Sequence, residues 1–586
     1  MIQRLRAAVQ RHWTVHPTTK SLAETEAEQY LFCLPSPWTA DVYHYATCVR
    51  FNRWYIFFAA FFSQFCIGSL YAWSVYNAYI DEHLTGDSTA GRAVLAFYTA
   101  ICCFGLSAAF LGPWLERVGP RCGIAAGASL FLAGHVGTGV AIAAKSMAGV
   151  HISYGVVAGT GMGLCYIAPV STLQKWFPDL RGTAAGFTVC GFGAGPILWA
   201  LAFPYPMQAW GATLSVSFSL FGVGMSAVLS LCAAVMRTPP AGFRVAGKDM
   251  HGIEREKTLL LEPPRPAPPR RTPSGNIILF QTSDLGPGPR CTESGKVILF
   301  LPEDLAVPVA QEEVAHPHEF YRECDLDDAE LFYFQRVKQL RLADCLFSLD
   351  FAFLWLMFLH ATVFGLVMLS RLKDMDAIIF SANGRVTPAD TSRAELMVSY
   401  NAIFNFAGRL LWPVLSDVVI RVGNFNPATG RKLIFAANLC VQLGVALSLR
   451  GAFAAKDHTR FQWLVWALTF VYGGGFGTIP CLLCDMFGAY NIGALHGIIL
   501  TCWAIAGVGG GLAFTSIFDA ADTNHSILAA CESAMPLFAG GVGIGLVALL
   551  LVRTNPVDRF APGYQFSVGR YVVCNFKPKG WQFRDL

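Results

Sequence analysis

The sequence predicts an all-α polytopic membrane protein whose twelve transmembrane helices form two six-helix, pseudo-symmetric bundles. Its 586 residues are 54% hydrophobic and only 14% charged, with a mean hydropathy of +0.45, whereas about a quarter of the residues in a soluble protein are charged. Lys plus Arg (43) nearly balances Asp plus Glu (39), for a net charge of +4. This composition excludes an ordinary water-soluble enzyme and carries no nucleic-acid-binding signature.

The apolar runs come as six, then a polar gap, then six. A membrane-spanning helix needs about 20 apolar residues. Runs of that length are predicted near 54–79, 93–114, 122–144, 151–173, 183–203 and 211–236, and then near 346–370, 395–416, 432–451, 461–484, 494–518 and 533–552. The expected order is an N-terminal tail (1–52), a first bundle (53–236), a linker (237–343), a second bundle (344–553) and a C-terminal tail (554–586).

The linker is hydrophilic and rich in proline. Its stretch 262–273 is predicted to be extended or disordered. A short sequence then repeats at a spacing of 20 residues, as 274–280 and 294–300, and these β-prone copies indicate a hairpin, a docking segment or a drifted duplication. Residues 325–341 are predicted to form an amphipathic helix that leads into the second bundle.

One short linker motif bears on localisation. Glu256, Leu260 and Leu261 resemble an acidic dileucine sorting signal, which coat adaptors read on the cytoplasmic side. Such short motifs also recur by chance in disordered segments. We therefore expect a multi-pass protein of the plasma membrane, with an endolysosomal membrane as the second choice.

Basic residues predict the orientation. They are frequent in the N-terminal tail and in the turns after the second, fourth and eighth spans, whereas the turns after the fifth and eleventh spans hold none. The turn after the seventh span carries Lys373, Arg385 and Arg393 against this trend, together with three Asp residues. The positive-inside rule then places both termini and the linker in the cytoplasm.

A shift of 311 residues relates the two halves. It aligns glycines and one proline of the fourth and fifth spans with their counterparts in the tenth and eleventh, namely Gly163 with Gly474, Pro169 with Pro480, Gly182 with Gly493 and Gly186 with Gly497. Parallel repeats of this kind imply a pseudo-twofold axis along the membrane normal, with a substrate cavity between the halves.

The loop between the second and third spans carries a signature. Residues 112–121 read Gly-Pro-Trp-Leu-Glu-Arg-Val-Gly-Pro-Arg, which resembles the Gly-x-x-x-Asp-Arg-x-Gly-x-Arg loop of the major facilitator superfamily. The resemblance implies that Gly112, Glu116, Arg117, Gly119 and Arg121 form a cytoplasmic charge relay that breaks when the halves rock. A degenerate copy in the second half keeps Asp417 near Arg421.

Further motifs are similar to those of the oxalate/formate antiporter-like branch of that superfamily, which includes monocarboxylate transporters. They lie in both halves, at 53–54, 68–75, 169–182, 191–195, 405–409 and 487–493. The branch moves small organic anions, including oxalate, formate, lactate and pyruvate. The resemblance does not cover the two tails or the linker.

One position departs from that branch. The oxalate exchangers pair the Arg of the eighth span with a Lys in the eleventh, where this sequence has Trp503. A divalent oxalate would thus meet one cation rather than two. The expected function is therefore secondary active transport of a monocarboxylate such as pyruvate or lactate by alternating access, as H⁺ symport or anion exchange.

Arg409 and Asn405 are the leading substrate-binding candidates. An Arg inside a span costs about 2.5–3.5 kcal/mol on insertion scales and is functional by default. Its planar fork suits a carboxylate, and Asn405 lies one turn earlier on the same helix face. The alternative is an Arg that reaches the cytoplasmic headgroups.

Aromatic and histidine side chains complete the candidate site. The tyrosines Tyr71, Tyr166 and Tyr472, together with Trp503, fall on helices that line the cavity in this fold, where a hydroxyl can orient a carboxylate. His360 and His135 lie mid-span and are the candidate proton carriers, although a neutral His bonded between helices is the commoner arrangement.

Other chemistry has little support in the sequence. Cys481 and Cys484 have a metal-like spacing but lack a second pair and lie in an apolar run. No nucleophile–base arrangement supports an enzyme, so neither a cofactor nor a metal is expected, and the protein is expected to be a monomer. The alternatives are a carrier of an amino acid or a dicarboxylate, or a non-transporting nutrient sensor whose linker recruits partners.

Overall fold

Twelve helices of the described chain are long and apolar enough to cross a membrane, as predicted. The computed structural model describes residues 9–15, 20–35, 42–87, 91–240, 243–252, 270–271, 277–278, 336–381, 387–514, 516, 527–560, 563–568 and 571–576. The spans of the first half contain α3 (Arg53–Ile67), α5 (Val94–Val118), α6 (Pro120–Ala143), α8 (Gly159–Trp176), α9 (Arg181–Ala202) and α11 (Leu214–Val235). Those of the second half contain α16 (Leu349–Ser370), α18 (Pro388–Gly423), α19 (Pro427–Ala454), α20 (His458–Phe487), α21 (Ile492–Ile505) and α23 (Ile527–Leu551).

Several spans change their helical winding along their length. Short helical segments extend three of them: the 3-10 turn η1 (Gly68–Ala72) after α3, the π-helix η2 (His151–Ala158) before α8, and the π-helix η5 (Ala506–Gly510) after α21. The first span was predicted as a single helix over 54–79, and in the structure α3 passes through the 3-10 turn η1 into α4 (Ser74–Thr85). At η1, a Cβ on Gly68 would lie 3.1 Å from the Phe192 Cα, so this glycine lets α3 and α9 meet closely.

Side-chain caps explain where several helices begin. The Asn52 side chain accepts a hydrogen bond from the Trp54 N–H before α3, at 3.1 Å. Thr387 and Asp390 form a capping box around Pro388, the first residue of α18. Such caps satisfy N–H groups that the first helical turn leaves unpaired, and proline suits that turn because it has no N–H.

The chain divides into two units. One contains Met1–Gly252 and Phe334–Asn555, with all twelve spans; the other contains Ile253–Tyr333 and Pro556–Leu586. In the second unit the described elements are helix α24 (Pro556–Phe560) and the two-stranded pairs β5–β6 (Arg270–Arg271, Ile277–Ile278) and β7–β8 (Tyr564–Val568, Tyr571–Phe576).

Several predictions for the linker lie outside the described residues. These are the sorting motif at Glu256, Leu260 and Leu261, and the second copy of the repeat, 294–300. Within the first copy, Ile277 and Ile278 pair with Arg271 and Arg270. Of the helix predicted over 325–341, the structure describes a helical turn at 336–339.

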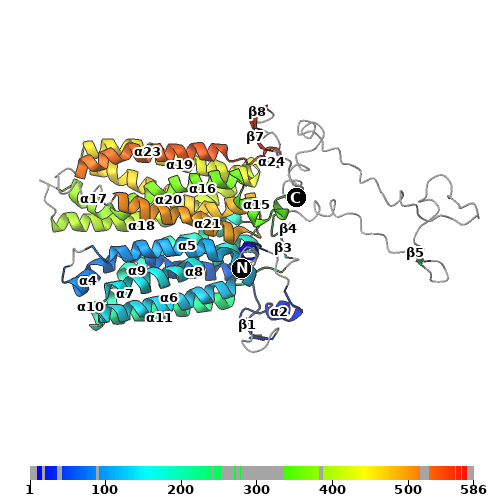
Figure 1. Cartoon of the computed structure of the whole chain (residues 1–586), viewed down its shortest axis with the longest axis horizontal. Helices are drawn as coiled ribbons and strands as arrows, with labels where there is room; N and C mark the ends of the chain where they lie inside the picture. The colour runs from blue at the N-terminus through cyan, green and yellow to red at the C-terminus, as the bar shows by residue number, and fades with distance from the viewer. Residues whose placement is uncertain are drawn as a thin grey trace, which may run out of the picture. The chain divides into compact units, whose positions relative to one another are not determined.

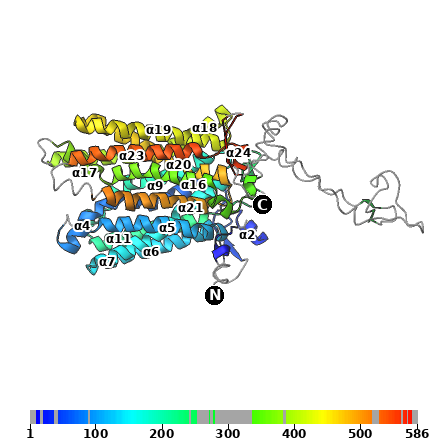
Figure 2. The ribbon, with the colours of Figure 1, turned by 45° about the horizontal axis from the view of Figure 1, so that its top comes forward.

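The two halves form separate groups of helices. In Figure 1 the blue-to-cyan helices of the first half lie together, and the green-to-red helices of the second half lie beside them. The groups meet mainly through α5 against α21 and α9 against α18, and α5 lies next to α21 in Figure 2 as well.

Two glycine pairs related by the 311-residue shift, Gly182 with Gly493 and Gly186 with Gly497, lie at these two crossings. A Cβ on Gly186 of α9 would be 3.0 Å from the Arg409 carbonyl oxygen of α18. A Cβ on Gly497 of α21 would meet the main chain of Ala108 on α5. Because corresponding positions make corresponding contacts, the predicted pseudo-symmetry is present in the packing.

The bundle has two distinct ends. At the end that we call the linker end lie α2 (Leu22–Ala27), the β1–β2 pair (Cys33–Pro35, Tyr43–Tyr45), the β3–β4 pair (Arg244–Val245, Lys248–Asp249) and α15 (Leu342–Leu346). At the opposite end, which we call the far end, lie α4, α7 (Met147–Val150), α10 (Tyr205–Trp210) and α17 (Leu372–Ile379) (Figure 1).

Candidate functional site

Arg409 lies deep in the bundle, and only its Nε is paired. Its side chain extends from α18 and is 1% exposed. Nε donates a hydrogen bond of 2.7 Å to the Asn405 Oδ1, one helical turn earlier. Both terminal nitrogens are buried and have no hydrogen-bond partner, and no carboxylate in the described part of the chain pairs with the guanidinium. Arg409 and Asn405 therefore share a helix face, as predicted, and the two terminal nitrogens of Arg409 have no hydrogen-bond partner among the described residues.

Side chains from both halves surround this guanidinium. They enclose a chamber of about 10 Å³, which is room for about one water molecule. Its walls are Tyr71, Phe104, Tyr166, Phe192, Arg409, Phe476, Leu500 and Trp503. The Arg409 Cζ lies 5.4 Å from the ring centroid of Phe192 and 5.0 Å from that of Phe476. Ring faces at this range attract a cation, but they leave its N–H groups available.

The chamber contains further unpaired donors. The hydroxyl groups of Tyr166 and Tyr472 and the indole Nε1 of Trp503 are buried, and no described residue meets hydrogen-bond geometry with them. Tyr472 packs behind the chamber wall: its ring centroid lies 5.1 Å from that of Phe476, which lines the chamber. A buried polar group without a partner costs about 1–3 kcal/mol. A cluster dominated by donors suits an occupant that brings acceptors, as a carboxylate does.

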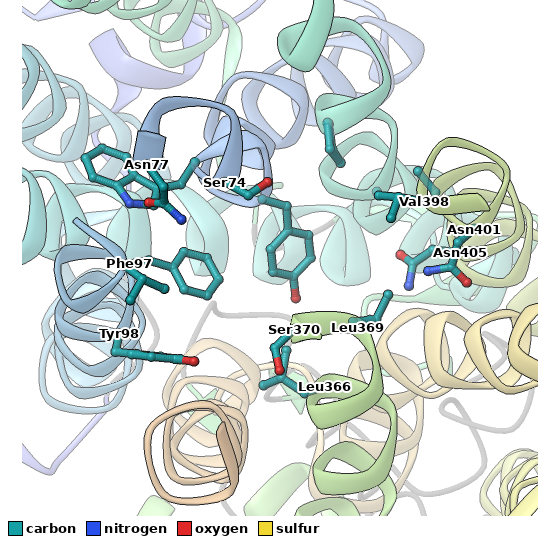
Figure 3. A pocket seen from close by; sticks show the side chains of 16 residues that line it. Ser74, Asn77, Phe97, Tyr98, Leu366, Leu369, Ser370, Val398, Asn401 and Asn405 are labelled. Atoms are coloured by element: carbon teal, nitrogen blue, oxygen red, sulfur yellow. The ribbon is translucent and has the colours of Figure 1, made fainter. Parts of the chain in front are cut away.

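A larger cavity lies on the far-end side of the chamber. It has a volume of about 210 Å³ and is lined by uncharged side chains from both halves. In Figure 3, Asn77 and Ser74 of the first half face Asn401 and Asn405 of the second across this cavity. Tyr71 lines both the cavity and the chamber, so it stands between them.

Two carboxylates close the linker end in a symmetric way. Glu116, at the end of α5, accepts a hydrogen bond of 2.6 Å from the Gly493 N–H at the start of α21. Asp417, near the end of α18, accepts from the Gly182 N–H at the start of α9, at 3.0 Å. Each carboxylate therefore caps a helix of the opposite half, where unpaired N–H groups and the helix dipole favour an anion.

Buried ion pairs reinforce this closure. Arg181 of the first half donates to the Asp485 Oδ1 of the second at 2.5 Å. Arg431 bridges Asp485, at 3.2 Å, and Asp417, at 2.7 Å. Lys175 pairs with Glu116. We call these six residues the gate cluster; only its two acids at the ends of α5 and α18 were predicted from the sequence.

The remaining signature residues make other contacts. Arg117 donates to the carbonyl oxygens of Arg11, at 2.9 Å, and Thr14, at 3.3 Å. Arg121 lies 3.8 Å from the Glu28 carboxylate. Both arginines thus hold the N-terminal segment rather than the opposite half.

The two signature glycines serve the backbone. A Cβ on Gly112 would lie 2.8 Å from the Ala494 Cα, so this glycine lets α5 approach α21. Gly119 ends α5 with φ +87°, a backbone conformation that residues other than glycine rarely adopt.

The two predicted proton carriers lie away from both cavities. The His135 ring stacks on Phe131 at 3.9 Å and packs against Gly222 of α11, inside the first half. His360 of α16 packs against Gly541 and Gly545 of α23, inside the second half. Hydropathy places both residues mid-span but does not indicate which helix face they occupy.

Comparisons with known proteins agree with this geometry. The sequence matches the family described as the Major Facilitator Superfamily over residues 54–511. It is 29% identical over 195 residues to the oxalate:formate antiporter of Oxalobacter formigenes, covering 32% of this chain and 43% of the antiporter. It is 23% identical over 363 residues to apicoplast pyruvate carrier 1 of Toxoplasma gondii, covering 59% of this chain and 55% of the carrier.

The fold is also that of a solved transporter. The proton:xylose symporter XylE, bound to 6-bromo-6-deoxy-D-glucose, superposes with a TM-score of 0.52 at 14% identity, covering 85% of this chain and 96% of the symporter. At this identity the likeness concerns the fold alone. The chain spans about half the length of the two sequence relatives above.

Proposed function

Because the chain belongs to the major facilitator superfamily, whose members are membrane transporters, we propose that it is a secondary carrier of a small monocarboxylate such as pyruvate or lactate. The observation that carries this proposal is Arg409, with two buried and unpartnered guanidinium nitrogens. Leaving a buried charge unpaired typically costs about 3–5 kcal/mol. A substrate carboxylate with two acceptor oxygens removes that cost and forms a bidentate pair.

The surroundings of Arg409 favour one carboxylate rather than two. Trp503 occupies the position at which oxalate exchangers of the resembling branch carry a Lys, and it adds one N–H donor and no charge. The chamber walls are otherwise aromatic and aliphatic, which suits the short apolar body of a monocarboxylate. The names of the two sequence relatives, an oxalate:formate antiporter and a pyruvate carrier, support the same substrate class.

The two ends of the bundle support alternating access. The uncharged cavity adjoins the chamber from the far end, and the gate cluster closes the linker end. With the far end outside, as the positive-inside rule predicts, substrate enters through this cavity and passes Tyr71. Since the chamber has room for about one water molecule, it widens as substrate binds. The gate cluster then separates and the far end closes.

A competition panel tests this proposal. The purified full-length chain in liposomes should take up labelled pyruvate, with inhibition by unlabelled lactate and little inhibition by oxalate, alanine or pyruvamide. Pyruvamide is the matched control, since it keeps the shape of pyruvate without the charge. Stronger inhibition by alanine or by a dicarboxylate would assign Arg409 to another substrate class. Absence of uptake for every carboxylate tested would reject transport of this class.

A further inference from the structure

His496 lies beside the candidate site, although its sequence position did not predict this. It lies on α21, two turns from Trp503 toward the linker end, and is 1% exposed. Its ring is 5.6 Å from that of Tyr166 on α8, and Tyr166 is a wall of the Arg409 chamber. Gly493, one turn further along α21, is held by Glu116 of the gate cluster. The imidazole thus lies between the chamber and the gate, where the two halves meet.

Both ring nitrogens of His496 are buried and have no hydrogen-bond partner in the part of the chain that the structure describes. An imidazole always carries at least one N–H donor, and a buried unpartnered polar group costs about 1–3 kcal/mol. His135 differs, because its Nδ1 bonds to the Phe131 carbonyl oxygen at 2.9 Å. The unpaired state of His496 therefore calls for a partner in another conformation of the protein.

We propose that His496 is the contact for the substrate carboxylate on the linker-end side of the chamber. When the gate cluster separates, water reaches the imidazole, which takes a proton from the solvent at that face and donates an N–H to the carboxylate. When the gate closes again, the imidazole returns this proton to the same face. This inference rests on the proposed function and extends it: binding of substrate from the linker end depends on the pH at that face.

Few other ionisable groups face this ring. Tyr166 of α8 is the titratable side chain in ring contact with it. Glu116 of α5 and Lys175 of α8 pair with each other one turn toward the linker end. From α20, Asp485 is held by Arg181 and Arg431. In the described chain, α15, α16 and η5, which also pack on α21, make no recorded ionic contact with the imidazole.

The first test requires no substrate. A His496→Cys variant of the full-length chain is prepared in sealed vesicles of either orientation, and alkylation of residue 496 by an impermeant maleimide is followed by mass spectrometry. Labelling should occur when the linker end faces the reagent and should be at least about tenfold slower from the far end, because the filled chamber separates residue 496 from the far-end cavity. Labelling from the far end, or from neither face, would overturn the assignment.

The second test measures pyruvate uptake in the same vesicles. With the linker end facing the medium, the wild-type KM should fall severalfold as the pH is lowered from about 8 to about 6, the range in which a hydrated imidazole gains its proton. His496→Asn, which can donate but cannot titrate, should remove this dependence. Its KM near pH 6 should rise about tenfold above the wild-type value, because a neutral hydrogen bond replaces a charge-assisted one. Uptake from the far end should be unchanged.

His135→Asn is the matched control, since that histidine lies within the first half and away from the path. It should keep the wild-type pH profile at both faces. If His496→Asn also keeps this profile at the linker end, or loses activity equally at both faces, the inference is wrong. If the wild type carries no pyruvate, the proposed function fails. The alkylation test needs no substrate, so it still shows whether residue 496 is reached from the linker end.

Discussion

In the proposed function, anion binding depends on the guanidinium of Arg409, whose terminal nitrogens have no hydrogen-bond partner among the described residues. The guanidinium of Arg409 packs against the rings of Phe192 and Phe476. Its Nε donates a hydrogen bond to the Asn405 side chain. Because this hydrogen bond holds the guanidinium at Nε, its terminal N–H groups are already oriented before substrate binds. Binding therefore costs less side-chain entropy than it would for a freely rotating arginine. Single substitutions around this group should therefore change which anion is carried.

Trp503 should set the charge of the preferred anion. In Trp503→Lys a second cation joins Arg409 in the chamber, and inhibition of pyruvate uptake by oxalate should strengthen at least about tenfold, since one added charge-assisted hydrogen bond contributes about 1.5–3 kcal/mol. Trp503→Phe controls for loss of the indole, and oxalate should remain a weak inhibitor of pyruvate uptake by this variant. Equal oxalate inhibition in all three proteins would exclude Trp503 as the determinant of substrate charge.

Gly193 should control the space beside the guanidinium. An added Cβ would lie 2.9 Å from the Arg409 Cδ and 3.2 Å from the Asn405 Oδ1, so Gly193→Ala should displace the fork and raise the KM for pyruvate about tenfold or more. Gly224→Ala is the control, because nothing lies within 4 Å of its added Cβ. An unchanged KM in Gly193→Ala would show that the fork tolerates this displacement.

Several of these contacts could not be predicted from the sequence. The spacing of Asn405 and Arg409 predicts a shared helix face, because i and i+4 are neighbours on one helix, and the structure confirms it. Arg181 and Asp485 lie 304 positions apart, and no local pattern links them. His135 and His360 both lie mid-span, but only tertiary packing determines that they face helices of their own half.

At the scale of the elements, each half caps a helix of the other. Glu116 caps α21 and Asp417 caps α9, while Arg181 and Arg431 converge on Asp485. These buried ion pairs have given up their hydration, so breaking them is costly unless water enters as they separate. They therefore couple the position of the helix ends to closure of the linker end.

Removing one charge from this cluster should open the linker end. Asp485→Asn leaves two buried arginines with less compensation, which destabilises the closed arrangement by about 3–5 kcal/mol. Alkylation of Cys484, which is 1% exposed beside Asp485, should then accelerate from the linker end. Asp457→Asn, at the far end of α20, should not have this effect. Unchanged labelling in Asp485→Asn would show that other contacts hold the gate.

At the scale of the whole twelve-span unit, a cavity lies at the far end and the gate cluster closes the linker end. Hydropathy was sufficient to predict the twelve spans, since each span must satisfy its backbone hydrogen bonds within an apolar stretch. The 3-10 turn at η1 and the close contact of Gly68 with α9 were not predicted, because hydropathy does not show which helices pack together. The positive-inside rule adds the expected orientation, with the linker in the cytoplasm.

Cysteine labelling in intact cells tests that orientation. In a background without reactive surface thiols, a Cys at position 524, which precedes α23 in the sequence, should react with an impermeant reagent. A Cys at position 274 in the linker should react only after permeabilisation. The prediction follows from an even number of spans between two cytoplasmic termini. Labelling of position 274 from outside would invert the protein and exchange the two faces of the transport cycle.

Anion binding by Arg409 is the central claim, and pyruvate flux through purified Arg409 variants in liposomes tests it most directly. Arg409→Ala should lose at least about a hundredfold in uptake at low pyruvate concentration, since about 3 kcal/mol of charge-assisted hydrogen bonding is removed. Arg409→Lys keeps the charge but loses the planar fork, so its uptake should lie between that of the wild type and that of Arg409→Ala. The amount of protein incorporated and its melting temperature serve as folding controls. If a folded Arg409→Ala protein carries pyruvate and lactate at the wild-type rate, Arg409 is not the anion site.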